Sequence, residues 1–151
     1  MYKLFIGILI IGLCLGYITN DLLTNPTLIL EQPTPGLPEQ PSPQQRITLE
    51  DITQTTNDLT IHKPATLLVH YTNTNSMDPT LDENSIGIEL PYTNQQLHEG
   101  DIISYDYEGQ RLVHRIQTIN GNTLTLQGDN SNTSHTITDK NIKGILIGIL
   151  Y

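Results

Sequence analysis

Five prolines fall between Gln32 and Gln45 and divide this chain of 151 residues into parts with different folding capacity. Proline removes a backbone donor and interrupts both helix and sheet, so a stretch this dense favours an extended polyproline II form. At ~3.1 Å per residue it would span roughly 43 Å. We therefore expect three regions: an N-terminal segment over 1–23, a proline-rich linker over 24–46 and a folded domain over 47–151.

The N-terminal segment is apolar or glycine at every position from Leu4 to Ile18, with Lys3 before the run. Counted from Met1, a helix would reach roughly 27 Å at ~1.5 Å per residue, close to the ~30 Å hydrocarbon core. The sequence predicts a single anchor that spans the cell membrane. Its N-terminus is expected on the inner side and the domain on the exported side. A cleaved signal peptide is the alternative, although the run lacks a small-residue cleavage motif.

Composition excludes several classes of protein. The chain has 16 acidic and 7 basic residues, a formal net charge of −9, so a partner that is a nucleic acid is not expected. A single cysteine, Cys14, excludes a disulfide framework and a CxxC zinc site. We expect no metal and no cofactor. The sequence does not specify the oligomeric state.

The folded domain has the pattern of a β protein. Short apolar or alternating runs predict strands, Glu108-Gly109 predicts a hairpin turn, and Asn120-Gly121 predicts a second hairpin of type I′. No apolar stripe of helical period has a useful length. We therefore expect a mainly β fold of antiparallel hairpins, with strands over 65–71, 85–90, 101–107, 110–119, 122–127 and 144–150.

One hydroxyl stands out as a candidate nucleophile. Ser76 follows an expected strand and precedes Pro79, which should end the strand and leave the hydroxyl exposed. A serine becomes nucleophilic only beside a base. The domain has no lysine between Lys63 and Lys140, so a histidine is the more plausible base.

His114 and Asp129 are the candidate partners of Ser76. Each has a structural alternative, since a strand histidine is often a packing residue and an aspartate in a Gly-Asp-Asn turn often binds its own backbone. A two-residue turn at Asn120-Gly121 would place His114 opposite Gln127 and Asp129 diagonally within reach. The carboxylate could then fix the tautomer of the imidazole, and activity would rise with pH through the ordinary histidine pKa of about 6.5.

Five blocks occur in a fixed order: NSMDPT, GDIISY, RLVHRI, GDNS and ITDKNIKGILIGIL. Over roughly 65–151 the chain resembles type I signal peptidases, and specifically the archaeal and endoplasmic-reticulum branch, in which a histidine replaces the bacterial lysine. The resemblance implies a signal-peptidase-like β fold behind one N-terminal transmembrane helix. It also implies a membrane-anchored serine endopeptidase that cleaves signal peptides of exported proteins.

The resemblance further implies a role for each matching residue. Ser76 matches the nucleophile, His114 the general base and Asp129 the acidic residue that supports the base. The hydroxyl of Thr74 and the backbone N–H of Ser76 match the oxyanion hole, in which loss of one donor costs ~10²–10³ in rate. His135 stands where the family usually carries a second aspartate, and it is a possible accessory residue.

Two other functions remain open. The histidine at position 135 is compatible with a catalytically weak or inactive relative that acts as a tethered binding module. A self-cleaving repressor-type domain shares the fold, but it predicts a Ser–Lys pair and a helix-turn-helix, and the sequence has neither. The long linker and the acidic domain both favour a position away from anionic lipid, so the substrate need not be an ordinary signal peptide.

Overall fold

The computed structural model describes residues 40–63 and 66–151, which belong to one structural unit. The expected anchor over 1–23 and most of the linker over 24–46 lie outside the described residues. Within the described ranges, no helix is both long enough and apolar enough to cross a membrane.

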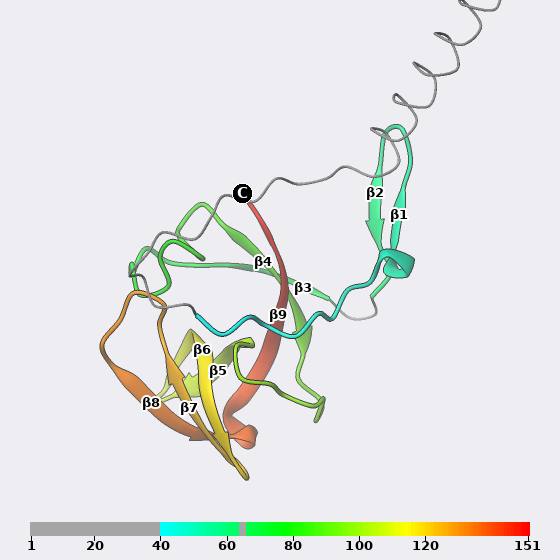
Figure 1. The fold of residues 1–151 in the computed structure, drawn as a ribbon. Helices are drawn as coiled ribbons and strands as arrows, with labels where there is room; N and C mark the ends of the chain where they lie inside the picture. Colours follow the sequence, from blue (N-terminus) through cyan, green and yellow to red (C-terminus); the bar gives the residue numbers. More distant parts are fainter. Residues whose placement is uncertain (1–39, 64–65) are drawn as a thin grey trace, which may run out of the picture. The chain divides into compact units, whose positions relative to one another are not determined.

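A seven-stranded sheet forms the body of the domain (Figure 1). Every neighbouring pair of strands is antiparallel, and the spatial order is β3-β4-β9-β5-β6-β7-β8. The expectation of a mainly β domain built from antiparallel hairpins is therefore confirmed. The strands are β3 (Leu67–His70), β4 (Ile86–Pro91), β5 (Ile102–Tyr107), β6 (Gln110–Asn120), β7 (Thr123–Gln127), β8 (Ser134–Thr138) and β9 (Ile142–Leu150).

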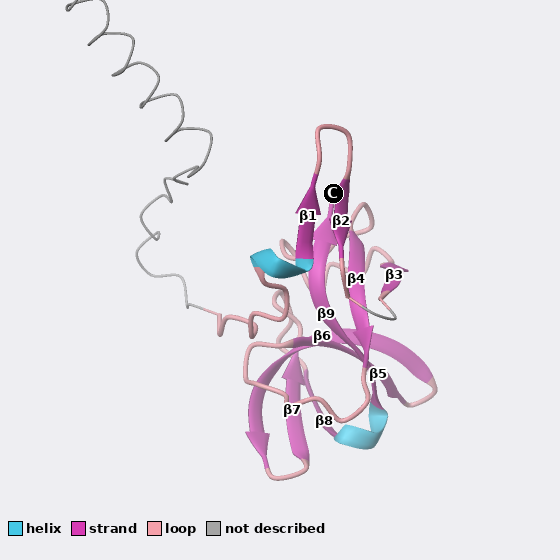
Figure 2. Ribbon diagram, turned by 90° about the vertical axis from the view of Figure 1, so that its right-hand side faces the viewer, coloured by secondary structure: helices cyan, strands magenta, loops and turns pink. Residues whose placement is uncertain are grey.

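A small hairpin forms a second sheet, separate from the first (Figure 2). It consists of β1 (Ile52–Gln54) and β2 (Leu59–Ile61), and the sequence analysis did not anticipate it. Two short 3₁₀ turns, η1 (Leu49–Asp51) and η2 (Asp139–Asn141), are the helical elements of the described residues.

Strand β9 joins the two halves of the large sheet. Its C-terminal part pairs with β4 and its N-terminal part pairs with β5, so Ile145 lies opposite both Leu90 and Ile103. One apolar cluster packs around β5 to β9 and the other lies beside the loop that follows β3. The first contains Ile103, Tyr105, Ile116, Leu124, Leu126, Ile137, Ile142 and Ile145, and the second contains Met77, Leu81, Ile102 and Leu146.

The two predicted hairpins have different outcomes. Glu108 and Gly109 form the predicted hairpin turn, and both residues have positive φ. In the second hairpin, Asn120 pairs with Thr123, so the central residues are Gly121 and Asn122 and not Asn120 and Gly121. Only Gly121 of these two has positive φ, which fits a turn with glycine at its first central position.

The register of β6 against β7 is consequently not the expected one. The turn moves by one residue, and the register shifts again between Ile116 and Thr118. Arg115 lies opposite Gln127, where the sequence analysis had placed His114. Because side chains alternate across a sheet, this correction exchanges which of the two neighbours faces the Asp129 loop.

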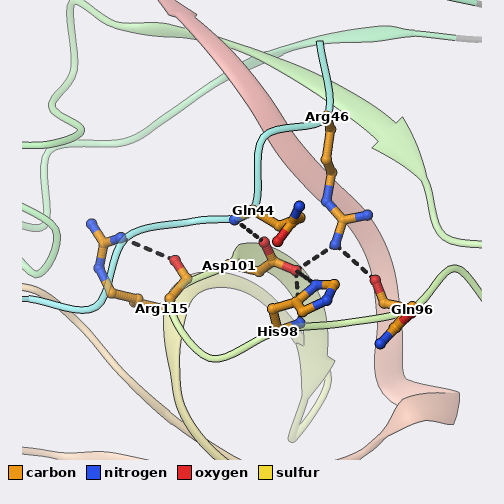
Figure 3. Close-up of polar contacts among 7 residues, drawn as sticks. Gln44, Arg46, Gln96, His98, Asp101 and Arg115 are labelled. Carbon is orange, nitrogen blue, oxygen red and sulfur yellow. Dashed lines mark hydrogen bonds and ion pairs between the residues drawn. The ribbon is translucent and has the colours of Figure 1, made fainter. Parts of the chain in front are cut away.

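The end of the proline-rich segment packs onto the domain (Figure 3). Asp101, which is 1% exposed, accepts hydrogen bonds from the backbone N–H of Gln44 and from the Arg46 guanidinium. Arg115 donates to the carbonyl oxygen of Pro41. The folded domain therefore begins before Ile47, and residues 40–46 form part of it.

Candidate active site

The Ser76 loop lies between β3 and β4, and the buried side chain of Met77 anchors it to the core. Met77 is 3% exposed and packs in the second apolar cluster, while its carbonyl oxygen accepts from the N–H groups of Thr80 and Leu81. Asn75, immediately before the serine, has φ of 56°, in the left-handed region that asparagine tolerates better than most residues. Ser76 itself is only half-buried, beside its buried neighbour.

The loop after β7 holds the backbone of the Ser76 loop. The N–H of Asn130 donates to the Ser76 carbonyl oxygen at 2.9 Å, and the Asn130 side-chain amide donates to the Asn75 carbonyl oxygen at 3.0 Å. A Cβ atom on Gly128 would collide with the Ser76 carbonyl oxygen, so only glycine permits this approach. The Gly-Asp-Asn sequence thus positions the candidate nucleophile through its backbone.

Asp129 binds an arginine and not the candidate base. The Arg115 guanidinium donates from Nε to Oδ1 and from Nη2 to Oδ2, both at 2.7 Å, and the Thr80 hydroxyl donates to Oδ2 at 2.6 Å. Both charged side chains are buried, and Arg115 also donates to the carbonyl oxygen of Gly100 at 3.0 Å. We call Thr80, Arg115 and Asp129 the Asp129 clamp. The structure places no hydrogen bond between Asp129 and His114.

His114 instead meets a tyrosine. The Tyr105 hydroxyl oxygen lies 2.7 Å from the Nδ1 atom of His114 and 2.7 Å from the Nδ1 atom of His135. The His135 ring also stacks on Tyr107, with ring centroids 4.4 Å apart. We call Tyr105, His114 and His135 the histidine relay. The structure therefore brings His135 to the candidate base through a residue that the sequence analysis did not select.

The single proton of the Tyr105 hydroxyl makes the relay directional. The hydroxyl can donate to one imidazole only, so it must accept an N–H bond from the other. For His114 to act as a base at Nε2, its proton must be on Nδ1 and donated to Tyr105, which then donates to His135. Burial raises the pKa of Tyr105, so its hydroxyl keeps its proton at ordinary pH.

Burial and charge keep His114 neutral. The ring is 7% exposed, and burial, with a smaller contribution from His135, lowers its pKa to about 4, while the charge of Asp129 acts in the opposite direction. His114 can therefore accept a proton at any pH above about 4. The rise of activity expected near pH 6.5 from an ordinary histidine is moved to more acidic pH.

Ser76 and His114 line the same cavity, of about 380 Å³, together with Thr74. The Ser76 hydroxyl lies 3.0 Å from the Thr74 hydroxyl and makes no hydrogen bond with the His114 ring. Catalytic hydrogen bonds of this kind commonly tighten only when substrate binds. Among the described residues none accepts a hydrogen bond from the Ser76 N–H, so that donor is available beside the Thr74 hydroxyl.

The sequence did not single out Tyr105 or Arg115. Tyr105 lies in the predicted strand β5, and Arg115 directly follows the selected residue His114 in β6. Tyr105 is fully buried in β5, where a hydroxyl requires a partner, and Ile103 pairs with His114 across the hairpin. That pairing places Tyr105 two residues further along the face that carries His114. No group of three or more His, Cys, Asp or Glu residues within 40–63 and 66–151 is arranged to hold a metal ion.

Comparison of the chain with protein-family models, with curated proteins and with solved structures gives no match.

Proposed function

We propose that this protein is a serine endopeptidase of the signal-peptidase type, acting on exported polypeptides. The observation that carries the proposal is the shared cavity, into which the fold brings Ser76, Thr74 and His114 from a loop and a strand 38 residues apart. The five sequence blocks support the same family and its β fold. The apolar N-terminal segment supports a membrane anchor with the domain on the exported side.

In the proposed mechanism, His114 takes the Ser76 hydroxyl proton at Nε2 as the oxygen attacks the scissile carbonyl carbon. The Ser76 N–H and the Thr74 hydroxyl donate to the oxyanion. The peptide bond breaks, the leaving amine takes the proton from His114, and an acyl-serine remains. Water, deprotonated by His114, then releases the acid and regenerates Ser76.

The histidine relay takes the part that the resemblance gives to a carboxylate. The Nδ1–H of His114 donates to Tyr105, whose hydroxyl donates to His135, so the base is held in one tautomer and one ring orientation. Asp129 contributes indirectly, because its clamp and its neighbour Asn130 fix the Ser76 loop.

A binding module is the second candidate function, and one observation favours it. No carboxylate among the described residues contacts His114, so the imidazolium formed during catalysis has no direct counter-ion. A protein of this kind would bind polypeptides in the same cavity and cleave them slowly or not at all.

Labelling with a fluorophosphonate tests the proposed function without knowledge of the substrate. This reagent phosphonylates an activated serine with loss of fluoride, so we expect the full chain to be labelled at Ser76 and the Ser76→Ala variant to lose the label. His114→Gln should slow labelling by about 10²–10⁴-fold, the range for removal of a general base. Peptide mapping by mass spectrometry identifies the modified residue.

Ser134→Ala is the matched control, because Ser134 is an exposed serine on β8 that makes no side-chain hydrogen bond among the described residues. It should be labelled at the wild-type rate. Labelling that is equally fast in Ser76→Ala would contradict the role of Ser76 as the nucleophile. No labelling of the wild type, together with no cleavage of peptides between pH 5 and 9, would favour the binding module.

A further inference from the structure

A carboxylate lies buried in the cavity of the candidate active site and has no part in the proposed mechanism. Glu89, on β4, is 3% exposed and lines the same cavity as Ser76 and His114. An ionised carboxylate so far from water is costly unless a positive charge or several donors compensate it. The groups around Glu89 therefore indicate which kind of ligand the cavity could bind.

Glu89 has two hydroxyl donors and no cation. The Tyr71 hydroxyl donates to Oε1 at 3.2 Å, and the Ser104 hydroxyl donates to Oε2 at 2.7 Å. Among the described residues, no Lys, Arg or His nitrogen lies within 4.0 Å of the carboxylate. Two neutral donors leave part of the acceptor capacity of a carboxylate unused.

The carboxylate of Glu89 packs directly against a glycine of the neighbouring strand. Gly144, on β9, has no side chain, and a Cβ atom there would collide with Oε2 of Glu89. The walls of the same cavity include the apolar side chains of Leu67, Val69 and Leu112. A pocket with apolar walls and one buried carboxylate suits a long aliphatic chain with a positively charged end.

Two cations also line the cavity, but both are directed to another acid. Arg111 Nε lies 3.0 Å and Lys143 Nζ lies 3.1 Å from the Asp106 carboxylate, and these side chains are 60% and 42% exposed. Solvent and salt screen charges at such exposed positions. Neither of them forms an ion pair with Glu89.

We propose that Glu89 is a specificity determinant that receives a basic side chain, ammonium or guanidinium, of the polypeptide substrate. The inference rests on the proposed function, since it names the substrate class of the same cavity. The aliphatic stem of the lysine or arginine would lie against the apolar walls, and its charged end would donate to the Glu89 carboxylate. Such charge-assisted hydrogen bonds are about twice as strong as those between neutral groups.

The first test compares two peptides with the full chain in mild detergent. One carries lysine beside the scissile bond, and the other carries norleucine, which has the same aliphatic stem without the charge. We expect kcat/KM to be at least about tenfold higher for lysine and Glu89→Gln to abolish that ratio. Glu83→Gln removes the same charge at an exposed position outside the cavity and should preserve the ratio.

The second test measures binding without catalysis. Isothermal titration calorimetry of the full-length Ser76→Ala variant should show binding of N-butylguanidinium but not of the neutral N-butylurea, and adding Glu89→Gln should remove the binding. Equal binding of both compounds, or binding that persists without Glu89, would overturn the proposal.

The two tests separate this inference from the proposed function. Cleavage of both peptides at equal rates leaves the endopeptidase standing and overturns the role of Glu89. Glu89-dependent binding of N-butylguanidinium by a chain that cleaves no peptide supports the role of Glu89 and contradicts the endopeptidase.

Discussion

Two neighbouring residues of β6 serve two unlike polar clusters. His114 and Arg115 are both buried and point to opposite faces of the sheet. Arg115 belongs to the Asp129 clamp, in which its guanidinium forms a bidentate salt bridge with the Asp129 carboxylate. His114 belongs to the histidine relay, in which one hydroxyl joins two imidazoles by hydrogen bonds along which a proton can change its position.

The two clusters suit different roles: the Asp129 clamp fixes the structure, and the histidine relay suits proton transfer. A buried ion pair with several hydrogen bonds is expensive to break, so the clamp suits the fixing of the Ser76 loop. An imidazole kept neutral by burial is ready to accept a proton, so the relay suits chemistry. Changes in the clamp should therefore affect stability first, and changes in the relay should affect rate first.

The largest expected effect comes from Arg115→Met. The change leaves the buried Asp129 carboxylate with only the Thr80 hydroxyl, and we expect the free energy of unfolding to fall by about 3–5 kcal/mol. Urea denaturation followed by circular dichroism measures the loss.

Arg111→Met is the matched control for that change. Arg111 pairs with Asp106 on the surface, and its side chain is 60% exposed, so the same substitution should cost at most about 1 kcal/mol. Equal losses in the two variants would contradict the distinction between the clamp and a surface ion pair.

The next effect is the dependence of stability on pH. His114 has a pKa of about 4 in the folded protein, against about 6.5 in the unfolded chain, so only the unfolded chain takes up its proton between these values. Its contribution to stability is complete above pH 6.5 and is lost as the pH falls toward 4, by roughly 3 kcal/mol in all. Denaturation curves from pH 7 to 4 measure this loss.

His114→Gln isolates the histidine in that experiment. Other groups also titrate over the same range, so the informative quantity is the difference between the two proteins. The variant should lose less stability than the wild type on acidification, and identical pH dependence in both would show that burial does not hold His114 neutral.

The smallest expected effect is that of Tyr105→Phe on rate. The change removes the hydroxyl that joins the two histidines and keeps the ring in the core. Loss of one such buried bond is worth about 1–3 kcal/mol, so kcat should fall by roughly 5–150-fold with little change in KM. Steady-state kinetics on a cleaved peptide separate the two constants.

Tyr107→Phe provides the control for the lost hydroxyl. Tyr107 stacks on His135, and its own hydroxyl has no hydrogen bond among the described residues. It should leave kcat within about twofold, since only an exposed or unpaired hydroxyl is lost. If both variants lose the same fraction of kcat, the relay has no special role.

The sequence predicted most strands because their apolar alternation is a local property. The hairpin at Glu108-Gly109 was also predictable, because a short segment containing glycine separates two runs with the pattern of strands. Strand β8 was missed because, within its five residues, the core receives only one fully buried apolar side chain, Ile137. So short a pattern has little periodicity to read.

The partners of His114 could not be predicted for a geometric reason. Asn120-Gly121-Asn122 contains two overlapping turn signals, and the structure uses the second. A shift of one residue reverses which side chains face a given partner, and it gave Asp129 to Arg115. The positions of Ser76 and His114 on one cavity did not depend on that register.

The contacts of residues 41–46 determine where a shortened form of the protein should begin. A fragment starting at Ile47 would remove the donors that Gln44 and Arg46 supply to Asp101, which is 1% exposed. It would also remove the Pro41 carbonyl oxygen from the guanidinium that binds Asp129. A fragment that starts at or before residue 40 keeps both sets of bonds and is the sounder choice for crystallisation.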